Sequence, residues 1–490
     1  MTSLRISRRD FLKFTASAGV AVSVGGVPAH AGSRNTCQAR RSADTINETA
    51  IRDFVSGVHG SVVRRTDQAY ESARRIWNAK FHRRPGLIVR CADKADVKRA
   101  VDFARAENLL VAVRGGGHSF AGYSMCDGGL VIDLSGMKEF HVDRQQRLVR
   151  AQPGLLGSEL DAATQRIGLA MVLGGCGSVG IGGFTLGGGE GDLSGKFGLS
   201  CDNLLSADVV LADGRSVTAS ARENADLFWA LRGGGGNFGI VTSFLFRAYP
   251  LTQVLAGQLV YDVAQAPTVM RAYREYALSA PDTLSTGLTF TLRKDGPVFL
   301  IHAVYAGDEA SAAPVLRSLR KLAKPKADTI APVSYLAFKT AKAGPPPGFP
   351  STVRTAFLPT LRDEVIDAIS EVGARSPPAA ELEMFHLHGA VSRVPILDTA
   401  FPLRRRGFDC FAAAAWLEPA QRDAVHGWVQ SFWDAVRPHA RGAYTNMFND
   451  EESDRVKEAY GRQYARLAML KRRFDPDNLF RLNPNIKPAA

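Results

Sequence analysis

The sequence predicts an α+β protein in which a mixed first part is followed by an antiparallel sheet backed by helices. Short apolar runs at 87–90 and 109–114 flank a segment with helical apolar spacing, which is the order of a parallel β-α-β unit. From 258 to 436, by contrast, pairs of predicted strands alternate with single helices. A hairpin signal, Asp295-Gly296, lies inside one of these pairs, which favours antiparallel pairing.

In the first part, Asp93 is the expected N-cap of a helix that ends near Glu107. Val97, Ala100 and Ala104 lie at the spacing of one buried helix face. The other elements expected here are strands at 130–134, 140–143, 148–152, 169–173, 207–212, 215–220 and 240–249, and helices at 158–167 and 224–231. Residues 32–80 are expected to form a polar linker followed by a helical segment.

In the second part, Ser311 is a plausible N-cap for a helix at 311–322, with Pro314 confined to its first turn. The other elements expected here are strands at 258–263, 286–293, 298–306, 382–389 and 408–416, and helices ending near 278 and spanning 361–372 and 420–436. A loop rich in proline and glycine separates them at 341–352.

A first glycine-rich loop follows the predicted strand 109–114 directly. Gly115-Gly116-Gly117 lets the backbone take positive φ and bring its N–H groups close to an anion. Arg114 adds a charged fork at the rim, and Ser119 adds a hydroxyl. These features predict a cradle for a diphosphate. They do not match the P-loop, because no Gly-Lys-Ser/Thr follows, or the Rossmann loop, because no helix begins there.

Two further glycine-rich segments follow. The run at 174–191 holds ten glycines in eighteen residues, but apolar residues such as Ile181 and Phe184 interrupt it, unlike a flexible linker. A backbone with so few side chains allows a flat ring system to lie against it. The segment 233–239 contains G-x-G-x-x-G, yet a helix precedes it and a strand follows, which is the reverse of the Rossmann order.

The runs RGGGHS at 114–119, AGYS at 121–124 and GGLVIDLS at 128–135 resemble the diphosphate loop of one enzyme group. These are the FAD-linked oxidases of the vanillyl-alcohol-oxidase/PCMH superfamily, berberine-bridge-enzyme-like branch. The resemblance spans about 87–250 and resumes at 444–486. It implies a PCMH-type FAD-binding domain of two subdomains and a substrate-binding cap. The expected divisions are a signal peptide at 1–31, the linker and helical segment at 32–80, the FAD-binding domain at 81–252, the cap at 253–440, and a segment at 441–490 that returns to the FAD domain.

The resemblance also implies that the flavin is covalently bound. In the family the loop histidine carries flavin through its 8α-methyl group, and this position is His118. Cys176 lies in a C-x-x-V-G pattern, where some members bind carbon 6 of the flavin through a thioether, although Gly177 replaces the usual proline. An unattached, packed thiol is the alternative for Cys176. A small β-branched residue at Val179 goes with oxygen access in the family, besides packing.

Tyr444-Thr445-Asn446 matches the family's Y-x-N motif, in which the tyrosine lies over the flavin as a base. Tyr444 and Asn446 are therefore the predicted catalytic residues, and a core tyrosine with a bonded hydroxyl is the alternative. A free phenol has a pKa of about 10, so Tyr444 needs help near neutrality. The residues that the resemblance assigns to FAD are Arg114, Gly115, Gly116, Gly117, His118, Ser119, Cys176, Val179, Gly180, Gly183, Gly187, Gly188, Gly239, Ile240, Val241, Asn483 and Asn485.

The amino terminus resembles a twin-arginine export signal. Ser7–Lys13 carries Arg8 and Arg9, a mild apolar stretch follows at 14–27, and Ala29-His30-Ala31 has the form of a cleavage site. The formal charge of the 490-residue chain is +13. Its basic residues are scattered without an aromatic-basic module, which argues against a nucleic-acid partner. No segment is apolar enough for a stable membrane anchor.

Other polar residues have open interpretations. His386 and His388 share one strand face, but no third ligand is spaced for a metal, so we predict packing or a substrate contact and no metal site. The cluster 404–406 is expected to be a solvated loop, or less simply a contact for an anionic substrate. Spacing does not pair the six cysteines, which are Cys37, Cys91, Cys126, Cys176, Cys201 and Cys410.

The predicted function is that of an exported FAD-dependent oxidase. It would oxidise an alcohol group of a sugar-like or other hydroxylated substrate with O2 and release H2O2. One alternative is oxidative ring closure or C–H oxidation of an aromatic or alkaloid-like metabolite, and another is flavin binding without turnover. The predicted partners are a small-molecule substrate, O2 and, during export to the periplasm or beyond, the twin-arginine translocase.

Overall fold

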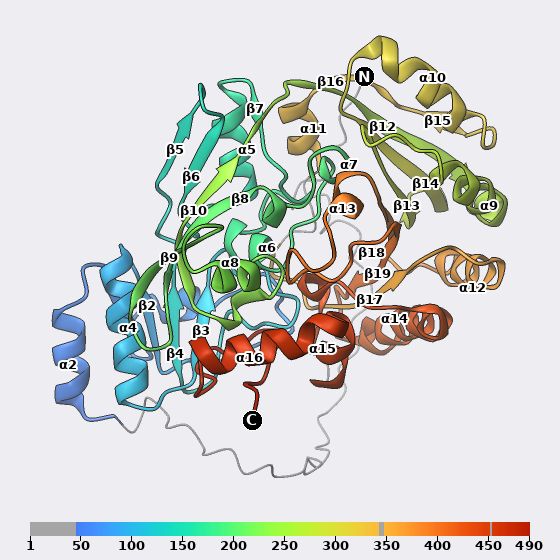
Figure 1. The fold of residues 1–490 in the computed structure, drawn as a ribbon. Helices are drawn as coiled ribbons and strands as arrows, with labels where there is room; N and C mark the ends of the chain where they lie inside the picture. Colours follow the sequence, from blue (N-terminus) through green and yellow to red (C-terminus); the bar gives the residue numbers. More distant parts are fainter. Residues whose placement is uncertain (1–45, 343–346, 451–452) are drawn as a thin grey trace. The chain divides into compact units, whose positions relative to one another are not determined.

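The structure is a computed structural model that describes residues 46–342, 347–450 and 453–490 (Figure 1). The predicted signal peptide and Cys37 lie outside these ranges. Three sheets organise the described chain, together with the short pair β7 (Leu169–Ala170) and β11 (Tyr249–Pro250). The combination of mixed and antiparallel sheets with helices confirms the predicted α+β class.

The first sheet has the order β1-β2-β4-β3. Its strands are β1 (Ser61–Arg64), β2 (Leu87–Arg90), β3 (Val111–Arg114) and β4 (Leu130–Asp133). β2 and β3 each pair parallel with β4, which lies between them, and β1 pairs antiparallel with β2. The sequence analysis missed β1, because residues 32–80 were expected to contain only a linker and a helical segment.

Helix α4 (Lys94–Ala106) connects β2 to β3 and confirms the predicted β-α-β unit. The side chain of Asp93 caps it by accepting a hydrogen bond from the Asp96 N–H at 3.0 Å. Val97, Ala100 and Ala104 are fully buried, as their helical spacing predicts. The last strand of this unit, β3, is therefore followed directly by the first glycine-rich loop.

The second sheet is antiparallel, with the order β5-β6-β10-β8-β9. Its strands are β5 (Phe140–Asp143), β6 (Leu148–Ala151), β8 (Leu204–Val210), β9 (Ser216–Ser220) and β10 (Ile240–Arg247). Helix α16 (Tyr464–Phe474), near the carboxyl terminus, contributes Leu467 and Phe474 to the hydrophobic cluster that contains Phe244 of β10. The end of the chain thus packs on the same core as residues 149–248.

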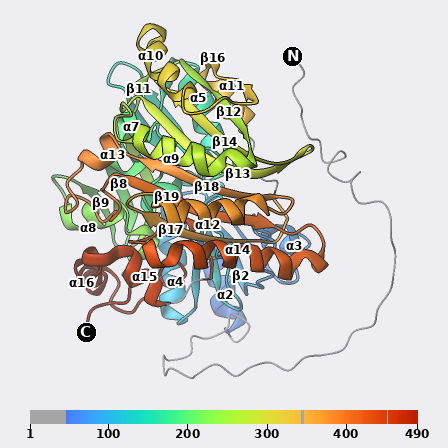
Figure 2. The same ribbon diagram turned by 90° about the vertical axis from the view of Figure 1, so that its right-hand side faces the viewer.

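The third sheet is antiparallel and has eight strands, in the order β15-β12-β14-β13-β18-β19-β17, with β16 pairing β12. Its strands are β12 (Gln253–Asp262), β13 (Leu284–Arg293), β14 (Gly296–Tyr305), β15 (Ala327–Asp328), β16 (Ala331–Ser334), β17 (Ser351–Leu358), β18 (Ala380–Leu387) and β19 (Gly407–Ala415). Four helices share one hydrophobic cluster with it, namely α9 (Ala266–Ala277), α10 (Glu309–Arg320), α12 (Asp363–Ala374) and α14 (Arg422–Val436). Figure 2 shows α9, α12 and α14 in front of the sheet.

The two faces of this sheet carry different side chains, because only one face packs against the helices. Met384 of β18 and Phe408 and Cys410 of β19 lie in the cluster with the helices. Because side chains alternate along a strand, Glu383 and Asp409 project from the opposite face. The face away from the helices therefore carries both of these carboxyl groups.

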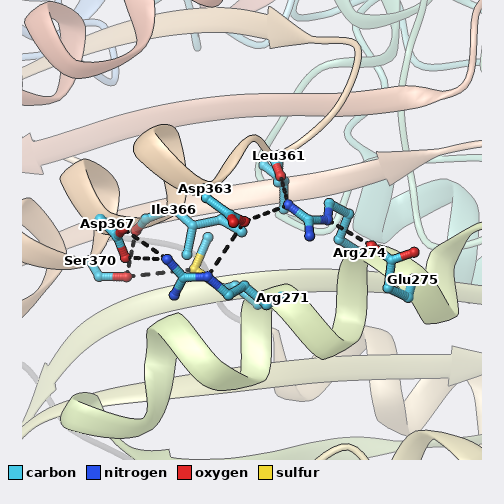
Figure 3. A network of polar contacts seen from close by, with 9 residues as sticks. Arg271, Arg274, Glu275, Leu361, Asp363, Ile366, Asp367 and Ser370 are labelled. Carbon is cyan, nitrogen blue, oxygen red and sulfur yellow. Dashed lines mark hydrogen bonds and ion pairs between the residues drawn. The ribbon is translucent and has the colours of Figure 1, made fainter.

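The helix layer is tied together by ion pairs (Figure 3). Arg271 of α9 reaches both oxygens of Asp367 on α12, at 2.7 and 2.8 Å, and Arg274 reaches Asp363 at 2.7 Å. The side chains of Asp363 and Asp367 are 60% and 59% exposed. These pairs lie on the solvent side of α9 and α12, where water screens them.

The remaining helices are short. The α-helices are α2 (Glu48–Ser56), α3 (Tyr70–Ala73), α5 (Gly157–Gln165), α6 (Ile181–Leu186), α7 (Ser194–Phe197), α8 (Ala225–Leu231), α11 (Tyr335–Ala341), α13 (Ala390–Arg393) and α15 (Ser453–Tyr460). The 3-10 helices are η2 (Ser200–Asp202), η3 (Gly235–Asn237), η4 (Val263–Gln265), η5 (Pro419–Gln421), η6 (Arg437–His439), η7 (Thr445–Met447) and η8 (Gly461–Gln463). In the described ranges, no helix combines the length and hydropathy that crossing a membrane requires.

Helix α10 corrects one prediction about a cap. Its N-cap is Asp308, whose side chain accepts from the N–H of Ser311 at 2.8 Å, so Ser311 is a helical residue and not the cap. Both residue types cap helices well, and the cap at Asp308 places Pro314 three residues deeper than a cap at Ser311 would, at the sixth helical position and not in the first turn as predicted. Ala312, Leu316 and Leu319 then form the buried face of α10.

Candidate active site

The first glycine-rich loop begins at Arg114, the last residue of β3. Arg114 donates from Nη1 to the Ala73 carbonyl at 2.6 Å, while its Nε is buried without a hydrogen-bond partner among the described residues. Gly117 has φ of +71°, a conformation that favours glycine. The hydroxyl oxygen of Ser119 accepts from the N–H of Tyr123 at 3.2 Å.

The first loop packs directly against the second glycine-rich run. A Cβ atom on Gly116 would lie 2.5 Å from the backbone nitrogen of Gly180, so neither backbone leaves room for a side chain there. Gly180 is the N-cap of α6. Gly183, inside α6, is exposed, and a Cβ atom there would meet nothing within 4 Å. The two loops thus form adjoining walls of bare backbone.

His118 and Cys176 lie together where these walls meet. The Cys176 Sγ is 3.8 Å from the His118 Nε2. The imidazole of His118 stacks on Trp77 with a centroid distance of 4.2 Å. Burial lowers the pKa of His118 to about 4, so the ring is neutral at physiological pH and a nitrogen lone pair is available for bond formation.

Three predicted residues follow Cys176 along the second run. The N–H of Val179 donates to the Cys176 carbonyl at 3.2 Å, which closes a turn around the thiol. Gly187 is the C-cap of α6, and a Cβ atom on it would clash with the side-chain amide of Asn446. Gly188, with φ of +125°, would place a Cβ atom 2.6 Å from the ring of Phe401. Gly187 thereby allows Asn446 to approach the second run.

The remaining predicted FAD residues form a separate group. Gly239 precedes β10, where Ile240 and Val241 are buried in hydrophobic clusters. Asn237 of η3 accepts from the Ile486 N–H at 3.0 Å and donates to the Pro484 carbonyl at 3.2 Å, which holds the segment of Asn483 and Asn485 beside this loop. The Oδ1 atoms of both asparagines are buried without a partner in the described chain.

Three hydrogen-bond donors converge on the phenol oxygen of Tyr444. They are the backbone N–H of Gly189 at 3.0 Å, the backbone N–H of Glu190 at 3.2 Å and the side-chain amide of Asn446 at 2.8 Å. A neutral hydroxyl has only two lone pairs, so three donors match a phenolate oxygen better than a phenol. The structure thus brings the two predicted catalytic residues together against the second glycine-rich run.

The protonation of Tyr444 depends on opposing influences. Burial raises its pKa above the usual range, and the carboxylate of Glu190 raises it further. The three donors oppose this shift, because each stabilises the ionised oxygen. The charge on Glu190 is therefore one variable that decides how readily Tyr444 ionises.

The sequence analysis missed Glu190 and Asp409. Burial raises the pKa of Glu190 well above its ordinary value and that of Asp409 to about 8, and the charge of Asp409 raises the pKa of Glu190 further. Asp409 is 1% exposed, and the Oε1 of Glu190 is buried. A signal was present, because Glu190 interrupts a run of glycines and Asp409 stands among apolar residues of a buried strand.

A second polar cluster lies nearby, where Lys339 and Lys342 approach the second run. Although burial opposes it, the ammonium groups of Lys342 and Lys339 lower the pKa of Asp192 to about 2, and Lys342 Nζ lies 2.6 Å from its Oδ1. Burial lowers the pKa of His302 to about 3 and raises that of Glu383 to about 8. At neutral pH, this cluster holds one ionised salt bridge beside a neutral imidazole.

The structure settles two interpretations left open by the sequence. His386 and His388 stack on each other with a centroid distance of 4.3 Å, and His388 also contacts the carbonyl of Pro281, so they are packed residues. Arg404 is neither solvated nor free for an anionic substrate. It is 3% exposed and forms a bidentate salt bridge with Asp202 at 2.6 and 2.7 Å.

Two observations show that these residues fit a flavin dinucleotide. The walls at Gly116 and Gly180 exclude side chains, which leaves bare backbone for a flat ring and a diphosphate. The Nε of Arg114 is a buried hydrogen-bond donor without a partner in the described chain, and the Oδ1 atoms of Asn483 and Asn485 are buried acceptors without one. No residue of this set contradicts the cofactor.

Comparison with family models gives three matches. Residues 85–220 match the FAD binding domain, residues 443–487 match the model described as berberine and berberine like, and residues 5–25 match the twin-arginine translocation pathway signal sequence. The last match supports the predicted export of the protein by the twin-arginine route, to the periplasm or the medium.

Relatives cover nearly the whole chain. An FAD-linked oxidoreductase of Dictyostelium discoideum is 30% identical over 89% of this chain and 97% of its own length. The (R)-6-hydroxynicotine oxidase of Paenarthrobacter nicotinovorans is 30% identical over 88% of this chain and 98% of its own. The crystal structure of 6-hydroxy-D-nicotine oxidase from Arthrobacter nicotinovorans has a TM-score of 0.81 at 28% identity, covering 88% of this chain and 99% of that one. This chain therefore belongs to the FAD-linked oxidases of the berberine-bridge-enzyme-like branch of the vanillyl-alcohol-oxidase/PCMH superfamily, and it is an FAD-dependent oxidoreductase.

Proposed function

We propose that this exported oxidase carries covalently bound FAD and oxidises an alcohol group of a sugar-like or other hydroxylated substrate, with Tyr444 as the base. The observation that carries the proposal is the convergence of three donors on the Tyr444 oxygen. Such a site stabilises the negative charge that a base must carry before it accepts a proton.

Tyr444 takes the proton of the substrate hydroxyl onto its phenolate oxygen. Asn446 and the N–H groups of Gly189 and Glu190 hold that oxygen in place before and after the transfer. Burial of Tyr444 keeps water from competing for the same oxygen. When bound, FAD would supply the acceptor for the hydride of the substrate carbon and the route by which two electrons reach O2, giving H2O2.

His118 and Cys176 are the proposed attachment sites for the flavin. The support is their distance of 3.8 Å at the junction of the glycine walls and the neutral state of the imidazole. Two side chains this close can reach neighbouring positions on one ring. Gly116, Gly180 and the loop from Arg114 to Ser119 would hold the diphosphate, and the group around Gly239, Asn483 and Asn485 would complete the site.

We further propose the division of the chain that the sequence suggests. Residues 81–252 and 441–490 form the FAD-binding domain, and residues 253–440 form the cap. Supporting this, Leu467 and Ile486 share a hydrophobic cluster with Phe244. In addition, Lys339, in α11, donates to the carbonyl of Leu173 at 3.2 Å, which would join the cap to the flavin-binding walls.

One purified preparation tests both parts of the proposal. Flavin that stays with the protein after acid precipitation supports the covalent bond, and His118→Ala and Cys176→Ala should each leave one attachment. In an anaerobic screen of carbohydrates that follows bleaching of the flavin, Tyr444→Phe should lower the reduction rate about 100-fold or more, because one positioned base contributes about 10²–10⁴-fold. Full reduction by Tyr444→Phe, or complete loss of flavin in acid, would contradict the corresponding part.

A second candidate is C–H oxidation of an alkaloid-like, amine-bearing substrate. It is favoured by the relative named for (R)-6-hydroxynicotine and by the carboxyl groups of Glu190, Glu383 and Asp409, whose raised pKa values a bound cation would lower, so that they would ionise against it. A panel with matched cyclic amines and sugars separates the two. Peroxide release with amines alone would replace the alcohol proposal, and release with sugars alone would exclude the amine.

A further inference from the structure

The second glycine-rich run begins and ends at one place in the structure. A Cβ atom on Gly191 would lie 2.3 Å from the carbonyl oxygen of Leu173, so the two ends of the run are in contact. We call residues 173–175 and 191–192 the neck of the run. The backbone between the two parts of the neck carries Cys176 and both N–H groups that donate to the proposed base. The position of the neck therefore decides where these groups lie.

Lys339 of α11 contacts one side of the neck. Its ammonium group donates to the carbonyls of Leu173, at 3.2 Å, and of Gly174, and it lies 3.5 Å from the Oδ2 of Asp161. Two carbonyls and one carboxylate therefore surround the three protons of this group. The side chains of Lys339 and Asp161 are 3% and 2% exposed, so water does not replace these partners.

The same helix contacts the other side of the neck. Lys342, one turn further along α11, places its Nζ 2.6 Å from the Oδ1 of Asp192, whose side chain is 2% exposed. In addition, Tyr335 shares a hydrophobic cluster with Val172 and Leu193, the residues that flank the neck on either side. Helix α11 therefore holds both ends of the second run, by charge and by packing.

The second run depends on such outside contacts because of its composition. Ten of its eighteen residues are glycine, and glycine loses more conformational freedom on ordering than any other residue. Without Lys339, the carbonyls of Leu173 and Gly174 would lose this donor, and Asp161 would lose its counter-ion. The two carbonyls belong to residues three and two positions before Cys176, so their loss of order would reach the thiol first.

We propose that Lys339 is a positioning residue that, by holding the neck, fixes the Cys176 thiol where the flavin is attached. The proposal rests on the proposed function, because it assumes that Cys176 is an attachment site. The attachment converts the thiol S–H and one ring C–H into a C–S bond, and the two protons and two electrons pass to O2 and form H2O2. Lys339 takes no part in this bond change. Its effect is on alignment, and a displacement of about 1 Å at a reacting atom slows a reaction about 100-fold.

Two backgrounds separate the attachment at Cys176 from that at His118. In His118→Ala holoenzyme only Cys176 retains flavin after acid precipitation, and adding Lys339→Met should lower the retained flavin by about 10-fold or more. In Cys176→Ala holoenzyme only His118 retains flavin, and Lys339→Met should leave that amount unchanged, which also shows that the protein folds. Lys196→Met is the matched control and should change neither amount, because the ammonium group of Lys196 donates to the carbonyl of Ala306 and not to the neck.

Hydrogen exchange of the holoenzyme gives a readout that does not depend on the covalent bond. In Lys339→Met, the backbone N–H groups of 173–192 should exchange faster than in the wild type, while those of β10 should not change. If Lys339→Met does not accumulate because Asp161 is left buried without its counter-ion, the double variant Asp161→Asn/Lys339→Met removes both charges and takes its place.

Equal flavin retention in His118→Ala with and without Lys339→Met overturns the proposal, and so does unchanged exchange across 173–192. A similar loss of flavin in both backgrounds also overturns it, because the effect would then not be specific to Cys176. If His118→Ala alone retains no flavin in acid, the proposed attachment at Cys176 itself fails, and the role of Lys339 fails with it for that separate reason.

Discussion

Two groups of buried carboxylates in this molecule have opposite surroundings. Asp475, at the end of α16, is fully buried, and its oxygens accept from the backbone N–H groups of Leu479 and Phe480, at 2.7 and 2.9 Å. Lys471 adds an ammonium group at 2.7 Å and donates its other protons to the carbonyls of Asn237 and Phe480. Every charged atom of this first group has its partners.

At Glu190 and Asp409, by contrast, one oxygen of each carboxyl group, Oε1 and Oδ1, is buried without a hydrogen-bond partner in the described ranges, and burial raises the pKa of both groups. A satisfied buried ion pair fixes the conformation of its segment, whereas a buried carboxyl pair without donors costs stability. The difference indicates that Lys471–Asp475 stabilises the fold, whereas Glu190 and Asp409 lower its stability. Perturbed carboxyl groups of this kind are typical of functional sites.

The largest effect on stability is expected from breaking the satisfied pair. Asp475→Asn would leave Lys471 buried without its counter-ion, and removal of one partner from such a pair typically costs about 3–5 kcal/mol of unfolding free energy. Burial already lowers the pKa of Lys471 to about 8, so the variant should relieve part of this cost by losing the lysine proton. Urea unfolding at pH 7, compared with Asp363→Asn, measures the difference. A midpoint equal to that of the control would show that the pair does not support the fold.

An effect of opposite sign is expected at the unsatisfied pair. Its folded-state pKa lies above the value of about 4 for an unfolded carboxyl group, so the folded state keeps a proton that the unfolded state releases. Stability must therefore fall as pH rises from about 4 towards the raised pKa, by at most about 1.4 kcal/mol per pH unit for one proton. Asp409→Asn should remove this fall and become more stable than the wild type at pH 7.

The free energy of unfolding of the wild type and of Asp409→Asn, measured at pH 4.5 and pH 7, tests the direction of this pH dependence. The advantage of Asp409→Asn should be small at pH 4.5, which is close to the pKa of about 4 of the unfolded carboxyl group, and should grow by up to about 3 kcal/mol at pH 7. An advantage that is the same at both pH values would mean that Asp409 does not titrate in this range. A loss of stability at pH 7 would mean that the carboxylate is satisfied by a donor.

Much of the fold could be predicted because its signals are local. The cap at Asp93 and the spacing of Val97, Ala100 and Ala104 define α4 within one stretch of chain. The exchange of Ser311 for Asp308 as a cap shows the limit of such signals, since two good capping residues lie three positions apart. Strand β1 was missed because its four residues gain their partner only when β2 lies beside them.

The candidate site divides in the same way. His118 and Cys176 belong to motifs, and the structure brings them to 3.8 Å of each other. Glu190 and Asp409 belong to no motif that a single sequence reveals, because the burial of Asp409 on the face away from the helices depends on the register of β19 against its neighbours. A slip of one residue would turn Asp409 into the helix layer. Long-range pairing of this kind becomes visible only in three dimensions.

The smallest effect is expected at the exposed ion pairs of α9 and α12, which complete the comparison (Figure 3). Arg271 and Asp367 meet at 2.7 Å with good geometry, yet their side chains are 35% and 59% exposed. Water and salt screen such a pair, and ordering two long side chains opposes its formation. A double-mutant cycle with Arg271→Ala and Asp367→Ala should give a coupling too small to resolve in 0.5 M salt, and far below the loss in Asp475→Asn. A coupling as large as that loss would show that geometry, and not burial, decides what a charge contributes in this molecule.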